Sequence, residues 1–218
     1  MPQELKVINC GGVNCYLVKT ATGYILIDTG VPNKRIEIEK ELATASCQPG
    51  SLALIVLTHG DYDHAGNAAY LREKYGAKVA MHKDDSMRVE RGDWKLGFKA
   101  KPDKFPLIFK IVSFFIRPGK FDTFKPDIYV EGGSLLEYDF EAQVLHLPGH
   151  TRGSIGILTK DGSLFCGDLM DNFRKPGLQF FIDDMAATRV SVEKLKKLNV
   201  KIVYPWHGKP FPMERFTQ

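Results

Sequence analysis

The chain has 218 residues, 44% hydrophobic and 26% charged, which predicts a globular protein with a single domain over residues 1–218. The formal net charge of +4 does not favour a general nucleic-acid-binding protein, although nine basic and four acidic residues between positions 91 and 127 predict a local basic surface. The N-terminal residues lack a secretion-signal pattern and the four cysteines form no CxxC pair, so we expect a cytoplasmic location and reduced, mostly buried thiols.

The first half of the chain alternates strand and helix patterns. Apolar or β-branched runs predict strands over 5–10, 14–20, 24–30, 51–58 and 77–82. The run 51–58 is almost wholly apolar, as a strand covered on both faces would be. Helical spacing predicts helices over 34–45 and 65–76, the second ended by Gly76.

The second half resumes this rhythm after an irregular segment at about 83–127, which we interpret as an insertion. Strands are predicted over 134–138, 142–147, 154–159, 163–167 and 200–205, and a helix over 185–198. Strands outnumber helices in both halves, and helices fall between strands. This pattern indicates an α/β fold in which sheets pack together with helices outside.

An apolar helix is predicted within the insertion, over 104–119. Three polar residues form one narrow stripe on it, and its apolar run is too short to span a bilayer. A lid over the core or active site, a homodimer contact and a membrane-surface contact are the three alternatives. If the segment is a lid, aromatic residues such as Trp94 and Phe109 would contact substrate, which predicts an amphiphilic or anionic-headed small molecule.

THGDYDHAG, residues 58–66, places two histidines and two aspartates directly after the apolar run. Alternate residues of an extended turn face the same side, so His59 and Asp61 can share one point, while Asp63 and His64 follow where the chain turns into a helix. Buried charge is costly unless it is paired or binds a metal. The stretch therefore favours a metal site over solvated loop residues.

Three later segments repeat the same arrangement. Each has one ligand-type residue beside Gly or Pro at the exit of a predicted strand: His150 in HLPGHTRGS, Asp168 in LFCGDLMD and His207 in YPWHGKPF. Separate strands that converge in this way can build one metal site at a sheet edge. His146, by contrast, is predicted to be a structural strand histidine, and His82, which follows a strand, is predicted to line the rim rather than to bind a metal.

These segments, together with DTG at 28–30, resemble the motif series of the metallo-β-lactamase fold superfamily, in the same order from residue 28 to 211. The resemblance implies a four-layer αβ/βα sandwich of two mixed sheets, with a metal site along one edge. It also implies that His59, Asp61 and His150 hold a first divalent metal and that Asp63, His64 and His207 hold a second. Asp168 would bridge the two metals, and Asp28 would lie beneath the site and orient ligands.

Position 61 departs from the commonest family pattern, HxHxDH, because this chain has HxDxDH. A third carboxylate lowers the charge of the metal cluster and favours harder metals such as iron or manganese. The flavodiiron oxygen and nitric oxide reductases resemble this chain in having a carboxylate there, but they also use a flavin partner domain. A non-haem iron redox enzyme is therefore the alternative function.

Hydrolysis is the leading functional prediction. A water bridging two metals, with zinc expected first, would attack an ester, thioester, lactone or phosphoester, and Asp63 would position it as the catalytic residue. Lys209 is a candidate contact for an anionic substrate, with a solvated lysine as the alternative. We expect no nucleic-acid partner.

Overall fold

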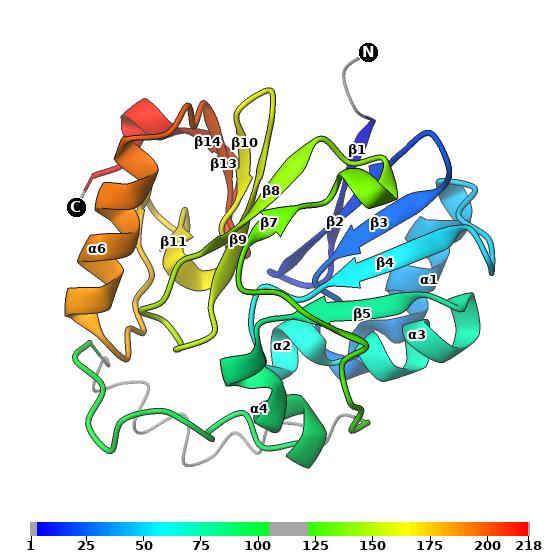
Figure 1. Ribbon diagram of the computed structural model, residues 1–218, viewed down its shortest axis with the longest axis horizontal. Coiled ribbons are helices and arrows are strands. Elements are labelled where there is room, and N and C mark those ends of the chain that lie inside the picture. Colours follow the sequence, from blue (N-terminus) through cyan, green and yellow to red (C-terminus); the bar gives the residue numbers. More distant parts are fainter. Residues whose placement is uncertain (1–3, 105–121, 218) are drawn as a thin grey trace.

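Two six-stranded mixed sheets form the centre of the molecule in a computed structural model that describes residues 4–104 and 122–217 (Figure 1). The first sheet has the order β1-β2-β3-β4-β5-β6, parallel from β3 onward: Leu5–Asn9, Asn14–Lys19, Tyr24–Ile27, Leu52–Val56, Lys78–Met81 and Ile128–Tyr129. The second has the order β14-β13-β10-β9-β8-β7: Phe211–Pro212, Ile202–Tyr204, Ser163–Phe165, Ile155–Thr159, Ala142–His146 and Gly133–Ser134. A small hairpin pairs β11 (Met170–Asp171) with β12 (Gly177–Leu178).

Helices cover the outer faces of both sheets. Those described are α1 (Arg35–Thr44), α2 (Tyr62–Ala65), α3 (Ala68–Tyr75), α4 (Ser86–Arg91) and α6 (Met185–Lys196). In Figure 1, α6 lies on one side of the two sheets and α1 and α3 lie on the other. Short 3₁₀ helices occur at Pro32–Lys34, Lys83–Asp85, Leu136–Tyr138, Gly167–Leu169 and Met213–Arg215.

The helices and the two sheets form four layers, and three clusters of apolar side chains lie between them. One packs α1 and α3 against the first sheet, one lies between the sheets, and one packs α6 against the second sheet. Strand β4 shows why its sequence is almost wholly apolar: Leu54 packs between the two sheets, and the next residue, Ile55, packs against the helices. Because successive side chains of a strand alternate, a wholly apolar strand is buried on both faces. The predicted four-layer αβ/βα sandwich is confirmed.

Two predicted elements differ from the structure. The helix predicted over 65–76 is broken, because the Asn67 side chain donates to the carbonyl oxygens of Thr29 and Val31, and α3 begins one residue later. The strand predicted over 134–138 is wrong beyond Ser134. There the chain forms a 3₁₀ turn that ends at Asp139 in the left-handed conformation, with φ 55°.

The insertion contributes α4 and the residues after it to the described structure. Apart from Lys104, the predicted helix at 104–119, with Phe109, lies outside the described residues. Within the described ranges, no helix has the length and apolarity needed to cross a bilayer. All four cysteines are buried and free, as expected.

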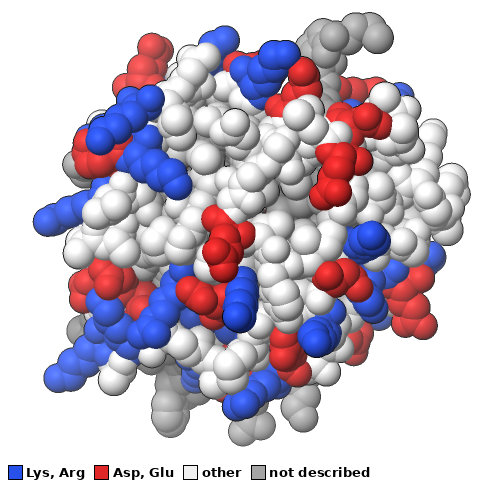
Figure 2. Space-filling view, viewed as in Figure 1, with Lys and Arg blue, Asp and Glu red and all other residues white. Residues whose placement is uncertain are grey.

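Charges are mixed on the face shown in Figure 2, where acidic side chains lie among the basic ones. Part of the basic segment is paired: Lys99 forms ion pairs with Asp103 and with Asp184, at 3.5 and 2.9 Å. Exposed pairs of this kind add little stability, but they reduce the local excess of positive charge.

Candidate metal centre

The predicted ligands follow the ends of strands that point to the same edge of the sandwich. His59 follows β4, whereas His150, Asp168 and His207 follow β8, β10 and β13. β3 and β4 are parallel, and so are β10 and β13, so their carboxyl ends meet at one edge. Asp28 follows β3 at this edge.

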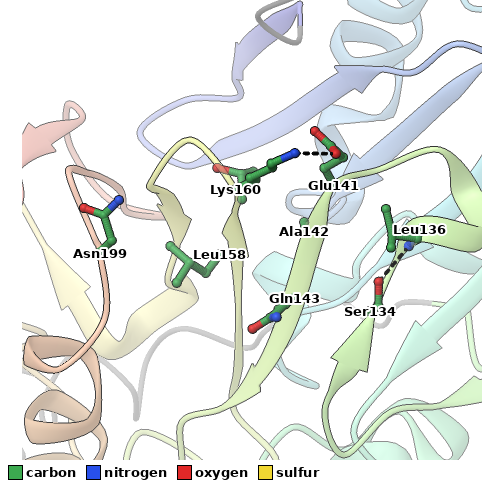
Figure 3. Close-up of a pocket in the computed structure, with 9 residues that line it drawn as sticks. Ser134, Leu136, Glu141, Ala142, Gln143, Leu158, Lys160 and Asn199 are labelled. Atoms are coloured by element: carbon green, nitrogen blue, oxygen red, sulfur yellow. Dashed lines mark hydrogen bonds and ion pairs between the residues drawn. The ribbon is translucent and has the colours of Figure 1, made fainter.

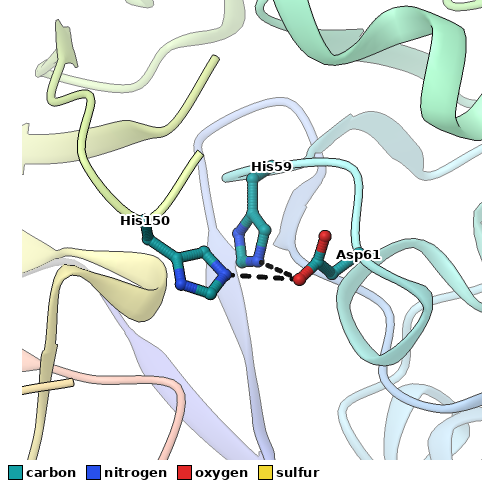
Figure 4. A group of neighbouring side chains, drawn as sticks. All are labelled: His59, Asp61 and His150. Carbon is teal, nitrogen blue, oxygen red and sulfur yellow. Dashed lines mark hydrogen bonds and ion pairs between the residues drawn. The ribbon is translucent and has the colours of Figure 1, made fainter. Parts of the chain in front are cut away.

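The first cluster comprises His59, Asp61 and His150, all of them buried (Figure 4). Asp61 Oδ2 lies 3.6 Å from His59 Nε2 and 3.3 Å from His150 Nε2. Their potential ligand atoms lie within 4.8 Å of one another. Three buried donors of these types at this spacing suit a divalent cation.

The second cluster comprises His59, His64 and Asp168 and shares His59 with the first. Asp168 Oδ1 lies 3.4 Å from His64 Nε2, and Asp168 Oδ2 lies 3.7 Å from His150 Nε2. Asp168 therefore faces histidines of both clusters. This placement is compatible with the bridging role that the sequence resemblance implies.

The four predicted histidine ligands each engage Nδ1 in an outer contact. His150 Nδ1 donates to the carbonyl oxygen of Phe181 at 3.0 Å, and His207 Nδ1 donates to that of Gly12 at 3.2 Å. His64 Nδ1 donates to Asp28 Oδ2 at 3.0 Å, and His59 Nδ1 lies 3.1 Å from the Thr58 hydroxyl. Such outer partners fix the tautomer and leave Nε2 available for a metal.

Several inward-facing atoms have no hydrogen-bond partner. His59 Nε2, His64 Nε2 and Asp168 Oδ1 are buried and have no hydrogen-bond partner among the described residues, although His64 Nε2 and Asp168 Oδ1 lie 3.4 Å apart. Leaving such atoms unpaired costs about 1–3 kcal/mol each, so an arrangement of this kind needs a compensating ligand. The residues present therefore fit divalent metal ions.

Asp63 and His207 lie at the rim, outside both clusters. Asp63 accepts a hydrogen bond from Trp206 Nε1 at 3.3 Å, and the charge of Asp63 acts on His64. The charge of His207 acts on Asp168. The structure thus brings five of the seven predicted ligands into tight clusters and leaves these two beside them.

Opposite charges dominate the electrostatics of the centre. Burial alone would raise the pKa of Asp61, but His59, His150 and Arg88 hold that pKa well below its ordinary value. Burial would likewise lower the pKa of His64, but Asp28 and Asp168 raise it well above its ordinary value. The carboxylates of the centre therefore favour a nearby positive charge.

Asp28 supports the centre from below. Its Oδ1 accepts from the Thr58 backbone N–H, and its Oδ2 accepts from the Thr58 hydroxyl, both at 2.7 Å, in addition to the His64 contact. Its backbone adopts the left-handed conformation, with φ 59°, which is uncommon outside glycine. This geometry agrees with an orienting role for Asp28.

Three buried residues were missed by the sequence reasoning. Arg88 donates to Asp61 Oδ1 at 2.6 Å, and Gln179 Nε2 donates to Asp168 Oδ2 at 2.9 Å. Asp85 accepts from the backbone N–H groups of Gly60 and Gly153, so it ties the two loops that carry His59 and His150. The stretch KDDSMR around Asp85 and Arg88 resembles a solvated helix start, so the local pattern contained no signal for these roles.

Aromatic side chains border the centre. Phe98 lies 6.2 Å from the His150 ring and 4.9 Å from the Phe181 ring, and Trp94 lies 6.1 Å from Phe98. Phe173, 67% exposed, lies 5.7 Å from the His207 ring. Lys209 is exposed.

A separate hollow of about 330 Å³ lies over β7, β8 and β9 (Figure 3). Its lining includes Gln143, Leu158 and Lys160, and none of the predicted ligands. It is therefore distinct from the metal centre.

Comparisons with known proteins agree with this architecture. The sequence model of the metallo-beta-lactamase superfamily matches residues 8–207. The probable metallo-hydrolase YflN of Bacillus subtilis is 26% identical over 223 residues, covering 93% of this chain and 83% of YflN. The hydroxyacylglutathione hydrolase GloC of Haemophilus influenzae is 31% identical over 125 residues, covering 55% of this chain but only 50% of GloC.

Solved structures show the same fold. TTHA1623, solved in a di-iron-bound form, superposes with a TM-score of 0.72 at 26% identity, covering 97% of this chain and 95% of that one. The chain spans 50–59% of the length of two of the curated relatives it matches.

Proposed function

This chain belongs to the metallo-β-lactamase superfamily, and from that membership we propose that it is a hydrolase dependent on two divalent metal ions. The observation that carries the proposal is the set of buried, unpaired atoms His59 Nε2, His64 Nε2 and Asp168 Oδ1. Structural polar residues in a core normally pair with one another. These atoms face one another across the two clusters without forming a hydrogen bond, and the nearest pair, His64 Nε2 and Asp168 Oδ1, lies 3.4 Å apart.

Each predicted ligand has a role in this proposal. His59, Asp61 and His150 would hold one metal, and Asp63, His64 and His207 would hold the other, with Asp168 between them. When bound, such metals supply an acidified water and polarise the bond to be cleaved. Asp63, held by Trp206, would orient that water toward the substrate. Zinc is the expected metal, and iron or manganese are the alternatives.

The substrate class is a small carboxylic ester, thioester, lactone or phosphoester. Thioesters are the first to test, because GloC is named as a hydroxyacylglutathione hydrolase. Trp94 and Phe98 on one side and Phe173 on another would contact apolar parts of a substrate. Phe109 and Lys209 remain predicted contacts for an amphiphilic or anionic molecule.

The test is hydrolysis of a matched panel of thioesters, esters, lactones and phosphoesters by zinc-loaded and chelated protein. We expect at least one class to be cleaved by the loaded protein and not by the chelated one, and activity to return when Zn(II) is restored. D63N should lower kcat by roughly 10²-fold or more. Full activity after chelation would refute the proposal.

A redox function is the second candidate, because Asp61 is a hard oxygen donor and TTHA1623 was solved with two irons. Iron in the purified protein together with oxygen consumption on addition of a reductant would favour it. Zinc without oxygen consumption would favour hydrolysis.

A further inference from the structure

Asp61 is the ligand position at which the sequence departs from the commonest pattern, and Arg88 is its closest buried partner. The guanidinium of Arg88 lies 2.6 Å from Asp61 Oδ1, whereas Asp61 Oδ2 faces His59 and His150. Figure 4 shows one carboxylate oxygen turned toward the two imidazoles and the other turned away. The two oxygens of this carboxylate therefore have different partners.

Arg88 is itself unusually well held. Its side chain is 2% exposed, which is rare for arginine unless the residue is paired. The same guanidinium donates to the carbonyl oxygen of Trp94 and lies 3.9 Å above the Phe98 ring. A planar guanidinium fixed on three sides leaves Asp61 little freedom to rotate.

We propose that Arg88 is a positioning residue for the metal ligand Asp61. By holding Oδ1, it would leave Oδ2 as the oxygen available to a metal, and its positive charge, shared with the more distant Asp85, would offset part of the negative charge that an aspartate adds relative to a histidine. The inference rests on the metal site of the proposed function and extends it to a residue on α4.

The experiment measures Zn(II) affinity by competition with a chromogenic chelator, using the full-length chain and the variants R88M, D61H and D61H/R88M. R91M, which changes an exposed arginine of the same helix, is the matched control. Removing a residue that orients a ligand typically costs roughly 10–100-fold in metal affinity, so we expect that loss at one of the two zinc sites in R88M. R91M should bind zinc like the wild type.

The double variant separates positioning from general support of the fold. With D61H, Arg88 loses its 2.6 Å partner and keeps only the longer ion pair with Asp85, at 3.8 Å, so a poorly compensated buried positive charge lies beside the metals. D61H/R88M should therefore bind zinc more tightly than D61H. The R88M substitution would thus raise zinc affinity in the D61H background, whereas it lowers zinc affinity in the wild type. If R88M fails to fold, recovery of folding and zinc binding in D61H/R88M supports the proposal equally.

Two results would overturn the inference. One is wild-type zinc affinity in R88M. The other is that R88M impairs binding or folding in the D61H background as much as in the wild type, which would make Arg88 a support for Trp94 and Phe98 only. If the wild-type chain itself binds no Zn(II), the proposed function fails together with the inference. Either of the two results above would instead overturn the role of Arg88 while leaving the metal site in place.

Discussion

At the scale of single residues, each of several candidate ligands has one polar atom that contacts an outer partner and another that faces the cluster. Asp61 gives one oxygen to Arg88 and one to the histidines, and Asp168 gives one to Gln179 and one to His64. The histidines divide their nitrogens in the same way. Ligands fixed before a metal arrives lose little freedom on binding it, which favours affinity.

Asp28 allows a direct test of this outer support. D28N should weaken zinc binding by roughly 10–100-fold, because a neutral amide no longer accepts strongly from His64. Asparagine tolerates the left-handed backbone at this position, so the variant should fold. D139N, another aspartate with positive φ but exposed and remote from the centre, is the control and should leave zinc affinity unchanged. Equal effects from both variants would count against the orienting role.

His82 makes a separate prediction about pH. Its ring stacks on that of His146 at 4.2 Å, and burial, followed by the charge of His146, lowers its pKa, opposed by Asp84, Asp85 and Glu131. The folded state therefore binds this proton less readily than the unfolded state, whose pKa is about 6.5. Stability attributable to His82 is present at higher pH and falls as the pH drops through 6.5 toward the lower folded pKa.

H82N tests this sign while retaining a side-chain acceptor for the Asp84 backbone N–H. The free energy of unfolding of the metal-free protein should fall less between pH 7.5 and pH 5.5 in H82N than in the wild type. Urea unfolding at the two pH values measures the difference, in which other titrating groups cancel to a first approximation. Parallel pH dependence in the two proteins would show that His82 does not contribute.

At the scale of elements, the segment from Lys83 to Arg91 joins ligand loops that come from different sheets. Asp85 binds Gly60 after β4 and Gly153 after β8, and both glycines lie close against it. A Cβ at Gly153 would lie 2.7 Å from Asp85 Oδ1. Glycine is required there by close approach, since the backbone φ is ordinary.

G153A should therefore destabilise the protein by about 1–3 kcal/mol and weaken zinc binding, because Asp85 must move away from the ligand loops. G132A is the control, since a Cβ at Gly132 would meet its nearest neighbour at 3.5 Å, an ordinary contact. Chemical unfolding and zinc competition measure the two effects. Unchanged zinc affinity in G153A would show that the loops do not depend on Asp85.

Strands were predictable from the sequence where burial sets the pattern, as in the run that became β4 and the alternation that became β8. The candidate ligands were predicted because their segments follow such strands beside Gly or Pro, and the structure brings five of the seven together. Arg88, Asp85 and Gln179 were not, since their roles arise from contacts with residues 11 to 68 positions away in the chain. A local pattern contains no information about such pairings.

At the scale of the whole molecule, the candidate metal centre draws its predicted ligands from loops of both sheets, so metal binding should couple to global stability. A site bound at a metal concentration 100 times its Kd adds about 2.7 kcal/mol. For a chain of this size that corresponds to roughly 5–11 °C in Tm. Thermal unfolding with Zn(II) and with chelator should differ by at least this amount. Identical Tm values would mean that no metal site links the sheets.

The central claim is that seven side chains from separate strand ends bind two metal ions, and anomalous diffraction from crystals of metal-supplemented protein tests it most directly. We expect two anomalous peaks per chain, one between His59, Asp61 and His150 and the other beside His64 and Asp168. Full supplementation with no peak at this edge of the sheets, or peaks only on the surface elsewhere, would contradict it.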